Sequence, residues 1–109
     1  MKETSVRQFR IAPTQYELFR FNVARPATVH LRMIATAPVN LLLLDTDDRV
    51  EYERGATETH PYTAAWGRRS ELEAAVRLDP GTWYLVVEGS TEPSKGRIEI
   101  SSTSPLVAA

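Results

Sequence analysis

The chain has 109 residues, of which 42% are hydrophobic and 25% are charged, and its formal net charge is −1. This length and composition predict one globular domain that is large enough to bury a core without a metal or disulfide. The sequence contains no cysteine, which excludes disulfides, thiolate chemistry and cysteine-ligated zinc, and the lack of a basic excess argues against nucleic-acid binding.

Apolar and polar residues alternate along most of the chain, and turn-forming residues interrupt the alternation at short intervals. In the second segment Phe19, Phe21 and Val23 share one face, while Arg20 and Asn22 share the other. A period of two is typical of β-strands with one buried face. The predicted strands, in chain order, cover residues 6–11, 16–23, 28–35, 39–44, 50–54, 70–78, 82–88 and 97–101.

Two of the predicted strands, 39–44 and 82–88, are apolar at both parities. Such strands are covered on both faces, so we expect each of them to be central in its sheet. Pro38 ends the strand that precedes the first of them. A turn at Pro80-Gly81 precedes the second, because proline presets φ and glycine supplies the positive φ that a type II turn needs.

Many short antiparallel strands around a common core are typical of a sandwich or a barrel. We therefore predict an all-β fold, a two-sheet antiparallel β-sandwich of jelly-roll type with about eight strands. The domain is expected to span residues 1–101, and residues 102–109 are expected to form a disordered tail. Residues 45–48 are predicted to form a turn, and residues 55–69 the longest irregular segment. The predicted centre of the core consists of Leu41, Leu43, Trp83, Leu85 and Val87.

Three segments carry a resemblance to a known family. They are a Tyr-x-Leu-Phe-x-Phe strand at 16–21, a strand that ends at an aspartate at 41–45, and a Pro-Gly-Thr-Trp-Tyr strand at 80–87. Their order resembles the bacterial pre-peptidase C-terminal domain, which implies a jelly-roll-like sandwich and a non-catalytic role. The chain also resembles small bacterial β-sandwich proteins of unknown function, sometimes joined to TIR signalling domains, in residues 40–45, 52–69 and 81–86.

The segment 53–69 concentrates aromatic and basic side chains, which are frequent at protein contact surfaces. Long loops on a rigid sandwich often carry binding residues. In the alternative interpretation the aromatic residues cover an open end of the core, and Trp66 is then buried against residues such as Leu43 or Leu85. The candidate partner- or ligand-binding residues are Arg54, His60, Tyr62, Trp66, Arg68 and Arg69.

Three aspartates, Asp45, Asp47 and Asp48, follow the end of a predicted strand. Carboxylate oxygens are the ligands that Ca²⁺ prefers, so these residues are a candidate calcium site. Aspartate is also a common turn residue, and the ligand spacing of an EF-hand is absent. We predict no cofactor, with calcium at these residues as the alternative.

No Gly-x-Ser-x-Gly elbow and no glycine-rich phosphate loop occurs, so we predict that the chain is not an enzyme. The leading hypothesis is a non-catalytic protein-interaction or self-assembly module of a bacterial protein, in which the edge of strand 6–11 pairs with a neighbouring chain. The alternative is a carbohydrate-binding module, with Trp66 and either Tyr62 or Tyr52 as an aromatic platform. The first seven residues lack the apolar segment of a signal peptide, and no stretch is long enough to span a bilayer, so we expect a cytoplasmic protein without membrane contact.

Overall fold

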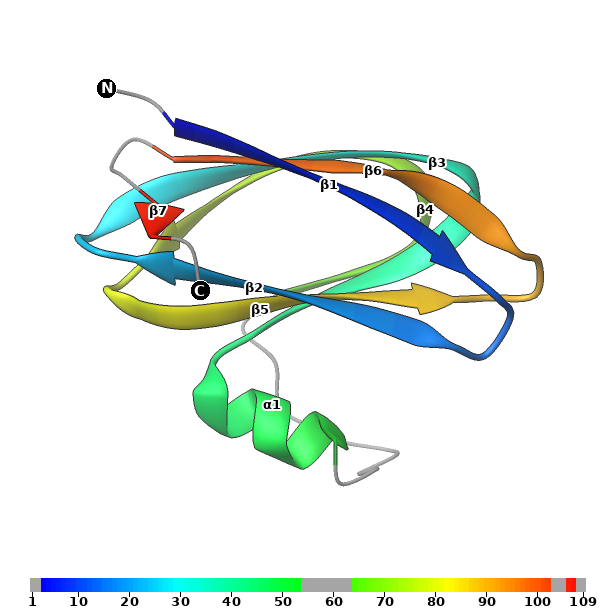
Figure 1. Cartoon of the computed structure of the whole chain (residues 1–109), viewed down its shortest axis with the longest axis horizontal. Helices are drawn as coiled ribbons and strands as arrows, with labels where there is room; N and C mark the ends of the chain where they lie inside the picture. Colours follow the sequence, from blue (N-terminus) through cyan, green and yellow to red (C-terminus); the bar gives the residue numbers. More distant parts are fainter. Residues whose placement is uncertain (1–2, 54–63, 103–105, 108–109) are drawn as a thin grey trace.

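The computed structural model describes residues 3–53, 64–102 and 106–107, which form strands and one short helix (Figure 1). All of the strand pairs in this part of the chain are antiparallel. The elements are β1 (Glu3–Ile11), β2 (Tyr16–Val23), β3 (Ala27–Leu44), α1 (Thr46–Glu53), β4 (Ala64–Leu78), β5 (Gly81–Gly89), β6 (Ser94–Ser102) and β7 (Leu106–Val107).

The strands form two layers that face each other, and β3 and β4 curve from one layer into the other (Figure 1). Layer 1 has the order β1, β6, the first half of β3 and the second half of β4. Layer 2 has the order β7, β2, β5, the second half of β3 and the first half of β4. When the halves of β3 and β4 are counted separately, each layer has the strand order of a jelly roll. The predicted all-β jelly-roll sandwich is confirmed.

Strand β3 passes through Pro38 without ending, so the predicted break at this proline is wrong. Proline removes a ladder donor, and the pairing of β3 with β4 shifts register between Ile34 and Val39, which is where such a residue is tolerated. The Ser94 hydroxyl replaces part of the missing ladder. It donates to the Ala37 carbonyl at 2.8 Å and accepts from the Ala37 N–H at 3.2 Å.

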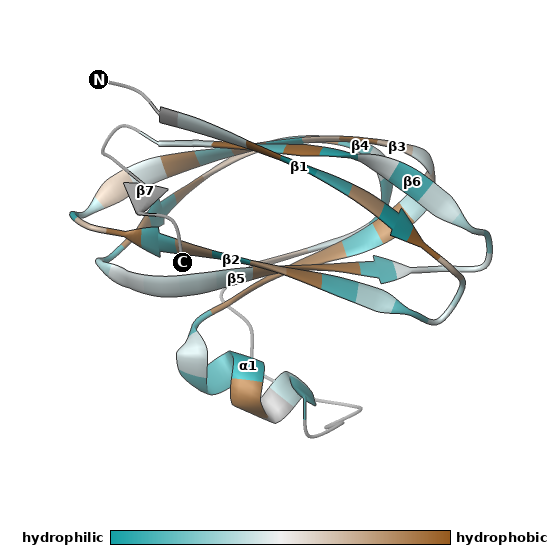
Figure 2. Cartoon of the chain, in the orientation of Figure 1, coloured by the Kyte–Doolittle hydropathy of each residue, from teal (hydrophilic) through white to brown (hydrophobic). Residues whose placement is uncertain are grey.

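The core lies between the layers, and every second residue of β3 from Ala27 to Leu43 points into it. The hydropathy colours alternate along the strands accordingly (Figure 2). Of the predicted central residues, all but Trp83 are at most 1% exposed. Trp83 is half-buried at the margin of the core, where its indole N–H donates to the Asp79 carbonyl at 3.0 Å. The indole therefore covers one end of the core and does not fill its middle.

Two predicted elements are wrong in kind or in extent. Residues 50–54 are predicted as a strand, but α1 occupies Thr46–Glu53. A two-residue alternation, Val50 and Tyr52, is too short to distinguish a strand from a helix. Strand β4 begins at Ala64, inside the segment predicted to be irregular, because this part of the chain pairs with the second half of β3.

Gly96 lies at a position where β6 packs very closely against both of its neighbours, β1 and β3. It is the Cα partner of Phe9 in β1 and of Ala35 in β3. A Cβ at this position would lie 2.1 Å from the Ile34 carbonyl oxygen and 2.8 Å from the Phe9 ring. Because the nearest atom belongs to the backbone, no side-chain rotation can relieve the clash.

We expect Gly96→Ala to lower the free energy of unfolding by about 2 kcal/mol, as overpacking at a tightly packed strand position does. Gly67→Ala is the matched control, since a Cβ there meets nothing closer than the Asn40 side-chain oxygen at 3.8 Å. Urea unfolding of both variants measures the difference. Equal stability of the two variants would contradict the close approach of β3 and β6.

Candidate functional site

The residues predicted from segment 53–69 do not gather at one place in the part of the chain that the structure describes. Arg54, His60 and Tyr62 lie outside the described residues. The other three lie at the start of β4, on different sides of it.

Trp66 is half-buried and packs against the main core cluster, which includes Leu43 and Leu85. It is the Cα partner of Leu41 in the adjacent strand. Its side chain lies on the inner side of layer 2. This is the geometry of a residue that covers the core.

Arg68 and Arg69 lie next to a bulge in β4. Arg68 has a φ of +46°, and its backbone N–H donates to the Asn40 side-chain oxygen at 2.8 Å. Arg69 instead lines a groove of about 370 Å³ together with Arg32, Glu71 and other residues of layer 1. The two arginines therefore have different environments. Arg68 lies at the bulge, where its positive φ kinks the strand, and Arg69 borders the outer face of layer 1.

The aspartates after β3 begin the helix α1. The Asp45 carboxylate accepts a hydrogen bond from the Asp48 N–H at 2.8 Å, and the Asp45 carbonyl accepts one from the Arg49 N–H at 3.0 Å. Asp45 is therefore the N-cap of α1. Burial, and then the nearby Asp45 carboxylate, raise the pKa of Asp48. Within the described residues, no three His, Asp or Glu side chains lie close enough together to hold a metal ion.

Helix α1 covers the outer face of layer 2 (Figure 1). Tyr52 of the helix and Leu18 of β2 pack against a second apolar cluster, formed by Leu42, Leu44, Tyr84 and Val86. This explains why residues 41–44 are apolar at both parities: one set faces the core and the other faces the helix. No helix among the described residues is long and apolar enough to cross a membrane.

A short hydrogen bond fixes the end of the helix to β5. The Tyr52 hydroxyl donates to the Glu88 carboxylate at 2.5 Å, and the Tyr16 ring meets the Tyr52 ring edge-on at a centroid distance of 5.2 Å. Desolvation raises the pKa of Tyr52, and the hydrogen bond with Glu88 raises it further. The helix also places Arg49 over the Tyr84 ring, 5.0 Å from its centroid.

No described element covers the outer face of layer 1. This face consists of alternate residues of 4–10 on β1, 95–101 on β6, 28–36 on β3 and 71–77 on β4. Two aliphatic side chains stand on it in solvent: Val6 is 48% exposed and Ile34 is 47% exposed. The sequence analysis did not identify this surface. Ile34 could have indicated it, because it is an apolar residue on the otherwise polar face of its strand.

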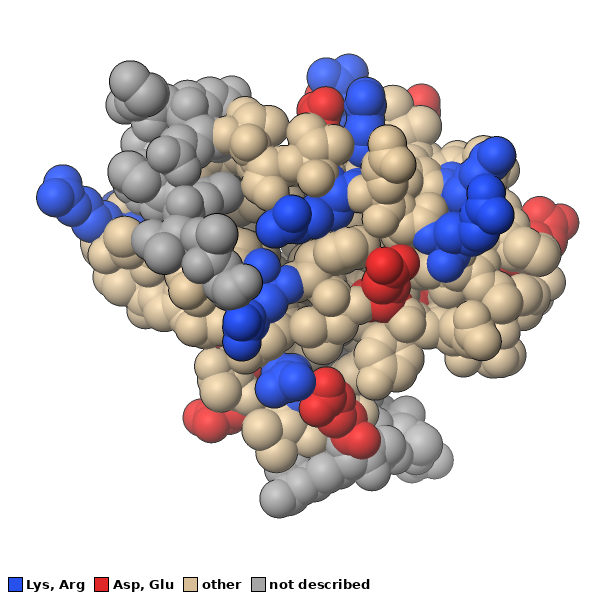
Figure 3. Space-filling view, viewed as in Figure 1, with Lys and Arg blue, Asp and Glu red and all other residues tan. Residues whose placement is uncertain are grey.

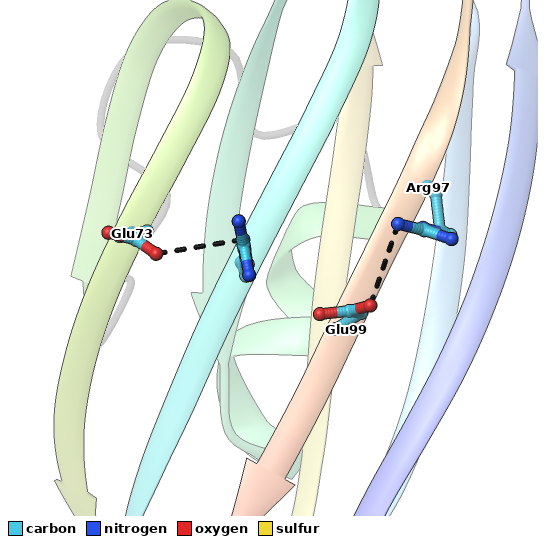
Figure 4. Close-up of polar contacts among 4 residues, drawn as sticks. Glu73, Arg97 and Glu99 are labelled. Carbon is cyan, nitrogen blue, oxygen red and sulfur yellow. Dashed lines mark ion pairs between the residues drawn. The ribbon is translucent and has the colours of Figure 1, made fainter.

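Charged side chains surround these aliphatic residues. Arg32 pairs with Glu73 across β3 and β4, and Arg97 pairs with Glu99 along β6, both at 3.6 Å (Figure 4). Exposed pairs of this kind add little stability. Basic side chains are spread over the side of the molecule seen in Figure 3, with acidic ones among them.

No protein-family model and no curated protein sequence matches the chain. Solved structures do match. The pre-peptidase C-terminal domain of a Bacillus anthracis collagenase is similar with a TM-score of 0.57 and 16% identity, over 89% of this chain and 88% of that one. The predicted resemblance is confirmed for the fold.

Two other solved structures share this fold. PliG of Aeromonas hydrophila, a periplasmic inhibitor of g-type lysozyme, has a TM-score of 0.66 and 8% identity, over 92% of this chain and 86% of that one. A protein of Bacillus endospore appendages, described as disulfide-linked pili, has a TM-score of 0.59 and 13% identity, over 94% and 84%. Such low identities show the fold alone, and the resemblance to proteins joined to TIR domains stays a prediction.

The capping role of Asp45 is testable against its neighbour. We expect Asp45→Ala to lower the free energy of unfolding by about 1 kcal/mol, because the first turn of α1 loses its N-cap. Asp47→Ala removes the same charge from an exposed position and should cost only a few tenths of a kcal/mol. The midpoint of thermal unfolding of the unaltered protein and of both variants is measured with and without calcium. A calcium-dependent rise of the midpoint that both variants abolish would instead indicate a metal site.

The Tyr52–Glu88 hydrogen bond predicts a pH dependence. Because the pKa of Tyr52 is raised on folding from a usual value of about 10, its stabilising effect is complete below pH 10 and is lost as the pH rises above it. We expect Tyr52→Phe to cost about 1 kcal/mol at pH 7 and less at pH 11. Tyr16→Phe, which keeps the ring contact, is the control. A cost for Tyr52→Phe that stays constant with pH would contradict the assignment.

Proposed function

We propose that this chain is a non-catalytic protein-interaction domain, and that the outer face of layer 1 is its contact surface for another protein or for a second copy of the chain. One observation carries the proposal. The two layers have unlike outer faces: α1 packs on that of layer 2, whereas that of layer 1 leaves Val6 and Ile34 about half exposed with no described element over them. The other exposed large apolar side chains are on the layer 2 side, where Tyr16 contacts the Tyr52 ring of α1 and Val50 belongs to α1 itself. Exposed aliphatic residues within a polar surface are typical of protein contact sites.

The structural neighbours support a binding role without specifying it. One of them inhibits a lysozyme and another belongs to a pilus. Both are small β domains whose described activity is association with another protein chain. The same fold is therefore compatible with such associations. Fold similarity does not indicate which residues make the contacts.

Strand addition at β1 is a second route to association. Within the described residues β1 pairs with β6 alone, so its other edge is free, as predicted for strand 6–11. The exposed Arg7 and Arg10 lie on this strand, and charged side chains are a common protection of free edges. We therefore favour the face over the edge.

The carbohydrate-binding alternative receives less support. Tyr52 packs on the outer side of layer 2 against the cluster under α1, whereas Trp66 packs on the inner side against the main core. The two rings lie on opposite sides of one layer, so the platform predicted from Tyr52 and Trp66 is wrong. The version of the platform that uses Tyr62 involves a residue outside the described part of the chain.

Photo-crosslinking tests the proposed contact surface. With p-benzoylphenylalanine in place of Ile34 we expect a discrete adduct, either of twice the chain mass or with one other protein of the native host. The same photoreactive group in place of the exposed Arg20 on layer 2 is the control, and Val6→Glu should lower the yield at position 34. Identical adducts from positions 34 and 20, or none from position 34, would refute the proposal.

A further inference from the structure

One groove on the outer face of layer 1 differs from the others on that face. It has a volume of about 660 Å³ and lies over a row of three Cα partners on adjacent strands, Phe9, Gly96 and Ala35. On each strand the residues before and after this row point outward and form the two walls. The walls are therefore separated by two residues along each strand, roughly 7 Å, which is enough for an extended peptide or one of its side chains.

One wall of the groove is strongly basic. Arg10 of β1 and Lys95 of β6 are direct Cα partners in this wall, and the other wall contains Arg97 of β6, which pairs with Glu99. Like charges directly opposite each other in an antiparallel pair destabilise a sheet. Among the described residues no acidic side chain pairs with Arg10 or Lys95, and none lines this groove. The fold therefore tolerates a repulsion that a bound anion would relieve.

The neighbouring grooves on this face show that the basic lining is a local property. Both of them include Glu73, and each has a second glutamate, Glu71 or Glu99. A smaller cavity of about 300 Å³ adjoins the basic groove and shares Arg10, Thr36 and Lys95 with it. Arg10 and Lys95, which have no acidic partner among the described residues, thus lie side by side at one end of the face, in a chain whose net charge is −1.

We propose that this groove binds an acidic peptide segment of a partner protein, with glutamate or aspartate carboxylates at Arg10 and Lys95 and an apolar side chain on Ile34. The proposal rests on the proposed function and names the class of partner. Ile34 forms part of the wall that contains Arg97, so an apolar contact and a charged contact lie side by side. This combination favours a peptide over a nucleic acid or a free phosphate, which offer no aliphatic partner for Ile34.

The test uses Lys95→Glu in the whole chain. This variant places a carboxylate opposite Arg10, so it should raise the thermal midpoint by roughly 2–4 °C while it removes the site. We expect a fluorescein-labelled hexapeptide of alternating glutamate and leucine to bind the unaltered protein, and Lys95→Glu to weaken that binding about tenfold or more. Arg20→Glu changes the charge equally on layer 2 and should leave the affinity within about twofold. A gain in stability together with a loss of binding excludes misfolding as the cause.

Two further measurements test whether the groove recognises an acidic peptide or any anion. A peptide with glutamine in place of glutamate should bind at least about tenfold more weakly, and inorganic phosphate at equal ionic strength should not shift the backbone NMR signals of Gln8, Thr36 and Gly96 as the acidic peptide does. Equal binding of both peptides, unchanged binding to Lys95→Glu, or shifts from phosphate alone would overturn the proposal. If crosslinks still form at position 34 in that event, the contact surface stands and only the acidic-peptide site falls.

Discussion

The fold depends on β3 remaining one strand through both layers. Its alternate side chains enter the core from Ala27 to Leu43, so a single stretch of backbone joins β4 and β6 in layer 1 to β4 and β5 in layer 2. The bend at Pro38 interrupts the ladder, and hydroxyls supply the missing partners: Ser94 bonds both backbone groups of Ala37, and Ser90 donates to the Pro38 carbonyl at 3.1 Å. Buried backbone groups must be paired, so without these hydroxyls the bend would be costly.

The difference between the two outer faces follows from β3 as well. In its second half the outward residues Leu42 and Leu44 are apolar, and a helix must cover them. In its first half the outward residues include His30 and Arg32, which are stable in water. The chain therefore uses α1 to close layer 2 and leaves layer 1 open, with Ile34 as the one large apolar side chain at an outward position of that half. The proposed contact surface is therefore the face that α1 does not need to cover, because the outward side chains of β3 there are mostly polar.

The charges of the outer face bear on specificity more than on stability. Its ion pairs are exposed and weak, whereas Arg10 and Lys95 face each other with no acidic partner among the described residues. A protein with a net charge of −1 gains little from long-range attraction to polyanions. Recognition at the proposed surface would depend on short-range matching of carboxylates and an apolar contact, which suits a partner that presents both.

The sequence by itself determined the β class, the strands β1, β2, β5 and β6 to within three residues at each end, and the positive φ of Gly81, because a period of two and a proline–glycine pair are local signals. Only the tertiary structure decided the rest. The helix at 46–53 depends on the Asp45 cap and on the apolar surface beneath Tyr52, and the extension of β4 to Ala64 depends on pairing with a strand more than twenty residues away. The basic groove exists because β1, β3 and β6, far apart in the chain, become neighbours, and no local pattern encodes which strands will meet.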